Sequence, residues 1–133
     1  MKRKEVFGFL NIPLLRHDIV LCCLDDFNNI VIHLNKKKNK EISDFLRKHL
    51  GNNFETNELN HLDGVVFYQK KNDYPVMLCI KNIKRGWDFY ETLIHETHHL
   101  VEKFANYCKF QNETEFKARL QEYLFRTIRK IIK

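Results

Sequence analysis

Five consecutive residues in the last third of the chain, His95-Glu96-Thr97-His98-His99, contain the motif H-E-x-x-H. If this stretch is helical, four residues make about one turn, so His95 and His99 project from the same face and can bind one Zn²⁺. Glu96 would then lie beside a water molecule at the metal and act as its general base. These residue types at this spacing predict metal-assisted hydrolysis of a peptide bond, in which Glu96 takes a proton and returns it to the leaving amine.

The residues around the motif have the pattern of a long amphipathic helix. Asp88 is a predicted N-cap, and Glu91 three residues later would complete a capping box. His95 and His99 fall outside the apolar stripe of this helix, so they are free to bind a metal. A solvated, histidine-rich helix face is the alternative interpretation, and we favour metal binding. The stripe consists of Phe89, Leu93, Leu100, Phe104 and Cys108.

The length and composition predict a single domain that spans residues 1–133. The chain is 44% hydrophobic, which is enough for a buried core, and it is too short for a two-lobed peptidase. We expect no signal peptide and no membrane span, because Asn11 and Pro13 interrupt the apolar stretch near the N-terminus. The four cysteines lack metal-ligand spacing, so we expect reduced core residues and a cytoplasmic protein.

The net charge of +6 makes a nucleic-acid-associated domain possible, but the distribution of the charge does not favour it. Residues 36–40 hold the densest basic cluster, which is typical of a solvated turn before a helix. A second cluster at residues 126–133 suits the last turns of a helix, where cations complement the helix dipole.

The rest of the chain predicts an α+β fold in which a small antiparallel or mixed sheet packs on the motif helix and a C-terminal helix. We expect residues 19–24 and 30–34 to form a hairpin and residues 42–50 to form a helix that stops at Gly51, followed by a loop to Gly64. Residues 65–68 and 76–80 are predicted strands. Residues 74–80 are a candidate for the sheet edge that binds an extended peptide, with an ordinary core strand as the equal alternative. A helix over residues 114–132 should lie antiparallel to the motif helix.

A catalytic zinc ion needs a third protein ligand, and no histidine follows His99. Glu102 lies about 10 Å along the helix axis from His95, which is far for a shared metal. We prefer Glu115, although it could instead pair with Arg119 in an ordinary (i, i+4) ion pair. The candidate carboxylates are Glu102, Glu113, Glu115 and Glu122.

The chain resembles the small phage-encoded zincin-like metallopeptidases. The resemblance rests on Trp87 before the motif at residues 92–99, on Thr114-Glu115-Phe116-Lys117-Ala118, and on residues 122–124. It implies a minimal zincin-like, gluzincin-type domain in which Glu115, followed three residues later by Ala118, is the third zinc ligand. The chain departs from the family pattern at Arg119 and Glu122, where smaller or less charged residues are usual.

The resemblance also implies a second catalytic residue and a substrate class. Tyr123 matches a recurring tyrosine of the final helix and could help to stabilise the oxyanion, a role for which His98 and Arg119 are alternatives. The expected function is that of a zinc-dependent metallopeptidase acting on a protein or peptide, with a phage or host protein as a further partner. The alternatives are a metal-stabilised phage structural or assembly protein and a basic nucleic-acid-associated domain.

Overall fold

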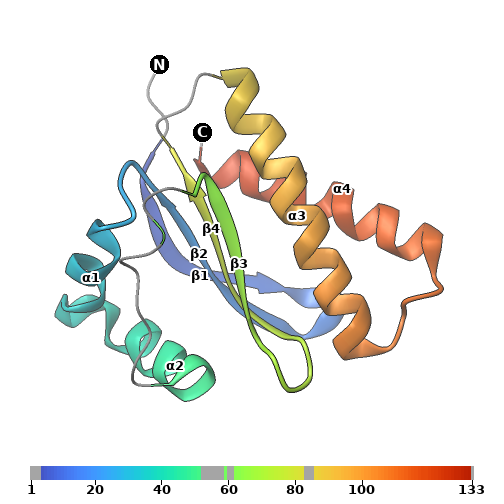
Figure 1. The fold of residues 1–133 in the computed structure, drawn as a ribbon, viewed down its shortest axis with the longest axis horizontal. Coiled ribbons are helices and arrows are strands. Elements are labelled where there is room, and N and C mark those ends of the chain that lie inside the picture. The colour runs from blue at the N-terminus through green and yellow to red at the C-terminus, as the bar shows by residue number, and fades with distance from the viewer. Residues whose placement is uncertain (1–3, 52–58, 60–61, 83–85, 133) are drawn as a thin grey trace.

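The computed structural model describes residues 4–51, 59, 62–82 and 86–132, whose arrangement is shown in Figure 1. Within these residues, the strands are β1 (Val6–Ile12), β2 (His17–Leu24), β3 (Gly64–Gln69) and β4 (Tyr74–Lys81). The α-helices are α1 (Asn29–Leu34), α2 (Lys40–Leu50), α3 (Gly86–Cys108) and α4 (Thr114–Ile132). Short 3-10 helices, η1 (Pro13–Leu15) and η2 (Lys37–Asn39), precede β2 and α2. The expected α+β class is confirmed.

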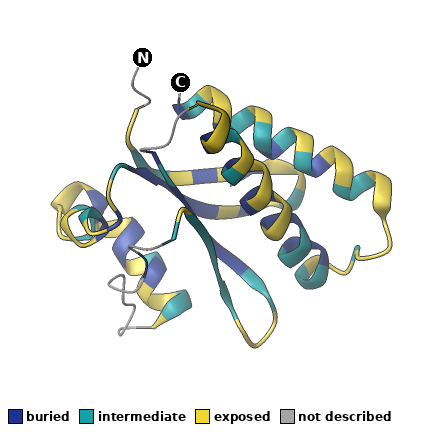
Figure 2. Cartoon of the chain, turned by 45° about the horizontal axis from the view of Figure 1, so that its top comes forward, coloured by how far each residue is buried: buried dark blue, intermediate teal, exposed yellow. Residues whose placement is uncertain are grey.

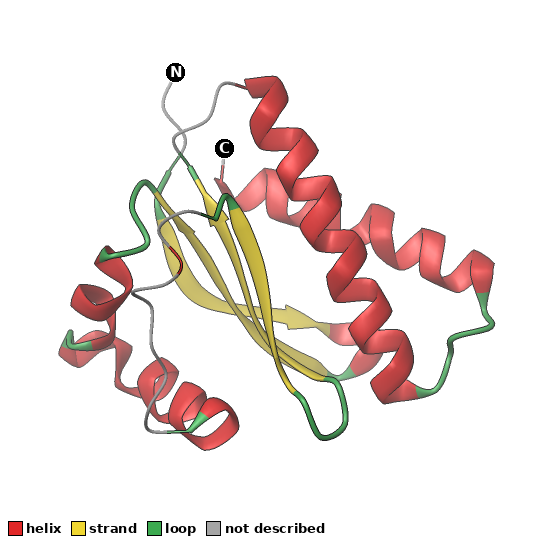
Figure 3. Cartoon of the chain, in the orientation of Figure 1, coloured by secondary structure: helices red, strands yellow, loops and turns green. Residues whose placement is uncertain are grey.

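The strands form one mixed sheet in the order β1-β2-β4-β3 (Figure 3). β1 and β2 are antiparallel, β2 and β4 are parallel, and β3 and β4 are antiparallel. Of the two interpretations of residues 74–80, the sheet edge is wrong and the core strand is correct, because β4 has β2 on one side and β3 on the other. A strand that is buried on both faces suits this interior position, and Val76 to Ile80 are almost inaccessible to solvent. In the described part of the chain, β3 is the edge strand on this side of the sheet.

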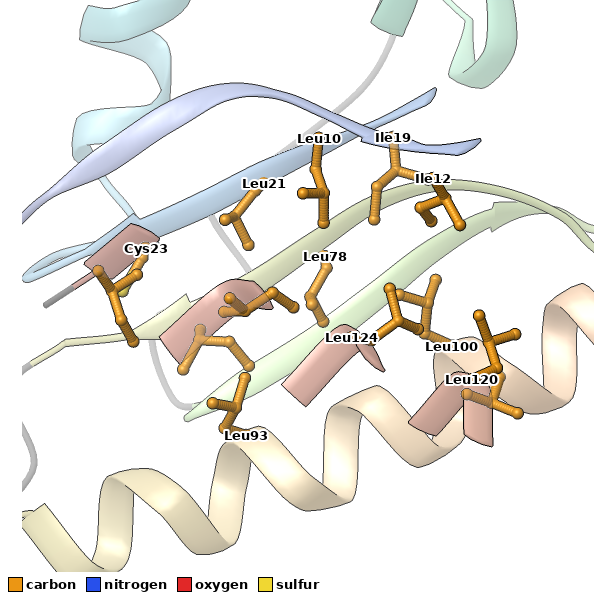
Figure 4. Close-up of a cluster of buried hydrophobic side chains, with 14 of the residues drawn as sticks. Leu10, Ile12, Ile19, Leu21, Cys23, Leu78, Leu93, Leu100, Leu120 and Leu124 are labelled. Atoms are coloured by element: carbon orange, nitrogen blue, oxygen red, sulfur yellow. The ribbon is translucent and has the colours of Figure 1, made fainter. Parts of the chain in front are cut away.

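Helices cover both faces of the sheet, and each face has its own core (Figures 1 and 2). Successive residues of a strand point to opposite faces, so Leu21 and Cys23 face α3 and α4, whereas Cys22 and Leu24 face α1 and α2. Figure 4 shows the α3–α4 side, where side chains from β1, β2 and β4 meet Leu93, Leu100, Leu120 and Leu124. This core fixes the position of α3, which carries the H-E-x-x-H motif.

Helices α3 and α4 lie antiparallel, as expected. Lys117 near the start of α4 forms an ion pair with Glu102 late in α3, with 2.9 Å between Nζ and Oε1. Farther along α4, Gln121 donates hydrogen bonds to the carbonyl oxygen of Ile94 (3.1 Å) and to Oγ1 of Thr97 (2.6 Å). No helix in the described part of the chain is long and apolar enough to cross a membrane.

The predicted hairpin of residues 19–24 and 30–34 is wrong, because residues 29–34 form α1. Only one side of this segment is buried: Phe27 and Ile30, three residues apart, are inaccessible, whereas Val31 and Ile32 are exposed. This spacing is helical, although the β-branched residues suggested a strand. The hairpin partner of β2 is β1, which the sequence analysis did not predict.

The other predicted elements match the structure to within a few residues. Helix α2 ends at Leu50, and Gly51 follows it with a φ of 88°, a conformation that favours glycine. Most of the loop predicted before Gly64 lies outside the described residues. Three of the cysteines, Cys22, Cys23 and Cys79, are buried free thiols as expected, but Cys108 is exposed rather than part of the core stripe.

The first residue of β2, His17, predicts a pH-dependent stability. Its side chain is buried, and its Nε2 donates to the carbonyl oxygen of Pro75 at 2.9 Å. Burial lowers the pKa of His17, an effect that the Pro75 hydrogen bond and the Asp18 charge only partly oppose. The unfolded chain therefore binds a proton near pH 6.5 that the folded chain resists. We expect the free energy of unfolding to be highest above pH 6.5 and to fall as the pH drops below it.

Chemical denaturation of the metal-free protein between pH 5 and pH 8 would measure this effect. His17→Phe keeps the ring contacts with Tyr74 and Phe104 and removes the titrating group. In the variant, the slope of the free energy of unfolding against pH should therefore be smaller by up to about 1.4 kcal/mol per pH unit. Burial also lowers the pKa values of His33 and His49, so the difference between the two proteins isolates the contribution of His17. Equal slopes in both proteins would contradict the prediction.

Candidate metal and catalytic site

Helix α3 presents the motif on the flank that faces β3. Its apolar side is buried against the sheet and α4, and the buried residues of the motif itself are Glu96 and Thr97. The helix begins at Gly86, so Asp88 lies in its first turn and is not the N-cap that the sequence predicted. The negative charge of the Asp88 carboxylate still stabilises the N-terminus of the helix through the helix dipole.

The side chains of His95, Glu96 and His99 converge. The Nε2 atoms of His95 and His99 are 3.0 Å apart, and Nε2 of His95 is 3.9 Å from Oε1 of Glu96. One ligand atom from each of the three residues lies within 4.8 Å of the others, and no other such group of metal-binding side chains occurs among the described residues. Two nitrogens bound to one tetrahedral Zn²⁺ lie about 3.3 Å apart. The histidine pair therefore fits zinc with little rearrangement.

Burial distinguishes Glu96 from the two histidines. The side chain of Glu96 is 10% exposed, against 68% for His95. Burial raises the pKa of Glu96, and the nearby His95 partly opposes this rise. A carboxylate with a raised pKa is a stronger base, which is the property that a general base requires.

The electrostatic surroundings of His99 favour its neutral form. Burial lowers the pKa of His99 most, and the charges of His95, His98 and Lys103 lower it further. A neutral imidazole has a lone pair available for a metal ion. His99 is therefore prepared to act as a ligand at neutral pH.

A groove of about 460 Å³ lies between β3 and α3, directly beside these groups. We call it the β3–α3 groove. A smaller pocket of about 370 Å³ adjoins it near the start of β3 and contains Asp63, Glu91 and His95. A substrate in the groove would thus contact Glu96 and His99. The groove is lined by Leu62, Gly64, Val65, Val66, Tyr68, Glu96, His99 and Lys103.

Gly64, the first residue of β3, allows the sheet to approach the carboxylate of Glu96. A Cβ atom at this position would lie 2.7 Å from Cγ of Glu96 and 3.1 Å from Cγ2 of Thr92. It would also lie 3.3 Å from the backbone oxygen of Cys79 in the neighbouring strand. The absence of a side chain at residue 64 therefore makes room for the buried Glu96.

The structure does not bring Glu115 to the histidine pair. Glu115 lies in the first turn of α4, its side chain is 80% exposed, and its Oε1 accepts a hydrogen bond from Nε of Arg119 at 3.1 Å. Helix α4 packs on the flank of α3 that carries Ile94 and Thr97, whereas His99 lines the groove beside β3. Glu115 thus occupies the ordinary (i, i+4) ion pair that the sequence analysis gave as its alternative.

None of the remaining predicted site residues belongs to the convergent group. Tyr123 is partly buried and packs against the core on the α3–α4 side of the sheet. Glu122 is exposed on α4, and Glu102 pairs with Lys117. His98 lines a largely apolar pocket of about 500 Å³ between α3 and α4, together with Ile94, Gln121 and His95 of the convergent group.

Sequence reasoning missed Gly64 and Lys103. In the sequence, Gly64 follows a polar stretch that predicts a loop, and the predicted site does not include Lys103. One signal was available for Lys103, which follows His95 and His99 at intervals of four residues and so shares their helix face. No protein-family model, curated protein or solved structure matches the chain.

Proposed function

We propose that this chain is a zinc-dependent metallopeptidase that hydrolyses a peptide bond in a protein or peptide substrate. One observation carries the proposal. The Nε2 atoms of His95 and His99 lie 3.0 Å apart beside the buried carboxylate of Glu96. The β3–α3 groove gives a substrate access to Glu96 and His99, and His95 lines the pocket that adjoins it. The three free, buried cysteines suit a reducing compartment, so we place the activity in the cytoplasm.

Each residue of the site has a separate task in this proposal. His95 and His99 would supply two of the protein ligands, and a bound Zn²⁺ would supply Lewis acidity that activates water and polarises the scissile carbonyl group. Glu96 accepts the proton from the attacking water and delivers it to the leaving amine. Among the described residues β3 is an edge strand, and its outer backbone groups can pair with an extended peptide and hold it in the groove.

Metal analysis of the purified, untagged protein tests the first part of the proposal. We expect about one zinc ion per chain in the wild type and loss of the metal in His99→Ala, because that variant removes half of the histidine pair. His98→Ala is the matched control, since it removes a neighbouring histidine that lies outside the convergent group. We also expect Glu115→Ala to retain zinc, because the carboxylate of Glu115 is exposed and paired with Arg119.

Hydrolysis of an unfolded, fluorescently labelled protein by the zinc-loaded chain tests the second part. Cleavage by the wild type and its loss in His99→Ala would support a peptidase. A wild type that binds zinc and cleaves nothing would instead support the metal-stabilised structural protein. If the wild type takes up no zinc, or if His99→Ala binds it as well as His98→Ala does, the metal site itself is refuted.

A further inference from the structure

The β3–α3 groove is elongated, because β3 and α3 run side by side along its length. Gly64 at the start of β3 lies against Thr92 and Glu96. Four residues later, the ring of Tyr68 lies beneath Nζ of Lys103, with 3.8 Å between Nζ and the ring centroid. The groove therefore extends from the catalytic carboxylate at one end to the ammonium group of Lys103 at the other.

Lys103 is held in place rather than free to swing into solvent. Its Nζ lies on the face of the Tyr68 ring, which attracts a cation. Nζ is also 3.7 Å from Oδ1 of Asp73 in the β3–β4 turn. Asp73 is in turn fixed by Asn106, whose Nδ2 donates to Oδ2 of Asp73 at 2.8 Å. Two elements outside α3 thus position this ammonium group at the groove.

The contacts of Lys103 leave it able to bind an anion. A distance of 3.7 Å to Asp73 is longer than a hydrogen bond, so this ion pair does not engage an N–H group directly. The side chain of Lys103 is 25% exposed. Lys103 is also the one cationic residue among the described residues that line the groove, whose other members beyond the site are mainly apolar. A carboxylate entering this end of the groove would meet a fixed positive charge.

The distance along the groove defines which substrate residue would meet Lys103. Four helical residues separate His99 from Lys103, a rise of about 6 Å. An extended peptide advances about 3.3 Å per residue, so this rise corresponds to about two residues. We propose that Lys103 selects substrates with an aspartate or glutamate side chain about two residues from the cleaved bond. This inference rests on the proposed peptidase function and defines the substrate class of the same site.

Cleavage profiling of the zinc-loaded, full-length chain tests the selectivity. A library of proteome-derived peptides first identifies cleaved sequences, and synthetic pairs then compare glutamate with glutamine at the same position. Each synthetic peptide is amidated at its C-terminus, so the two members of a pair differ only in the side-chain carboxylate at the tested position. We expect kcat/KM to be about tenfold higher for the acidic peptide, because a charge-assisted hydrogen bond stabilises its complex.

Variants of Lys103 separate selection from a structural role. The readout is the ratio of kcat/KM for the acidic peptide to kcat/KM for the neutral peptide. Lys103→Met and Lys103→Gln should lower this ratio from about ten to about one, and Lys103→Arg should retain it. Lys117→Met is the matched control, because Lys117 pairs with Glu102 on the side of α3 that packs against α4. It should cleave both peptides like the wild type.

Three results would overturn the inference. They are a wild type without acidic preference, a preference that survives in both Lys103→Met and Lys103→Gln, and an equal loss of cleavage of the acidic and neutral peptides in those variants. A wild type that binds zinc and cleaves no peptide in the library refutes the peptidase function, and the selectivity fails with it. Cleavage without acidic preference refutes the selectivity alone.

Discussion

Replacing Glu96 with glutamine should lower the rate of peptide hydrolysis by about 10² to 10⁴-fold, the usual contribution of a general acid–base residue. Glutamine has nearly the same shape as glutamate, so it fills the buried space beside Gly64. It cannot accept the proton from water or return it to the leaving amine. His95 and His99 are unchanged, and zinc content should therefore remain that of the wild type.

The measurement is kcat for a cleaved peptide, together with the zinc content of the same preparation. Glu102→Gln is the matched control, because it makes the same chemical change on the same helix, outside the groove, and breaks only a surface ion pair with Lys117. This control should cleave the peptide at the wild-type rate. Glu96→Gln with wild-type activity would remove Glu96 from the mechanism, and loss of zinc in Glu96→Gln would make it a ligand instead.

The helices that carry the site could be predicted because their signals are local. The apolar stripe of α3 and its H-E-x-x-H motif repeat at helical spacing, and α4 was predicted with the bounds Thr114–Ile132 that the structure shows. The antiparallel packing of α3 and α4 followed from the short link between them. Periodicity within one segment was sufficient for each of these results.

The sheet was predicted less well because strand order depends on contacts between distant segments. β2 and β4 pair in parallel, with Val20 opposite Met77, and no local signal indicates such a partner. Consequently, the sequence does not distinguish an edge position for β4 from a core position, and the structure places β4 in the interior of the sheet. The run of β-branched residues in α1 was assigned to a strand because local propensity does not show which side of a segment is buried.

The candidate site divides in the same way between local and distant residues. His95, Glu96 and His99 lie within one helical turn or so, and the structure brings them together as the spacing predicted. Glu115 was chosen to complete the site on another element, and the structure leaves it exposed beside Arg119. The element that does approach Glu96 is β3, and that contact depends on the register between β3 and β4.

Substituting alanine for Gly64 should impair hydrolysis through the position of Glu96. The new Cβ would lie 2.7 Å from Cγ of Glu96, a distance that requires a shift, and Glu96 is too buried to swing into solvent. Displacing a catalytic group by about 1 Å can cost about 10²-fold in rate, and overpacking of this kind destabilises a fold by about 1–3 kcal/mol. Zinc binding should survive, because the three atoms nearest to the new Cβ belong to Glu96, Thr92 and Cys79 and not to His95 or His99.

Gly8→Ala provides the matched control for this substitution. Gly8 lies in β1 of the same sheet, and a Cβ atom there would meet nothing within 4 Å. We therefore expect Gly8→Ala to hydrolyse peptides like the wild type and to unfold at a similar or slightly higher temperature. Equal activities of Gly8→Ala and Gly64→Ala would show that Gly64 does not set the position of Glu96.

A double-mutant cycle can show whether the cost of Gly64→Ala comes from Glu96 itself. In a Glu96→Ala background the Cγ atom is gone, and the nearest atoms to the new Cβ become Cγ2 of Thr92 and the backbone oxygen of Cys79. Gly64→Ala should then destabilise the protein by at least about 0.5 kcal/mol less than it does in the wild type, since residues in contact give non-additive free energies. In a Glu96→Gln background, which keeps Cγ, the full cost should remain. Additive free energies in both backgrounds would show that the destabilisation by Gly64→Ala comes from β3 and its neighbouring strand, and not from contact with the side chain of Glu96.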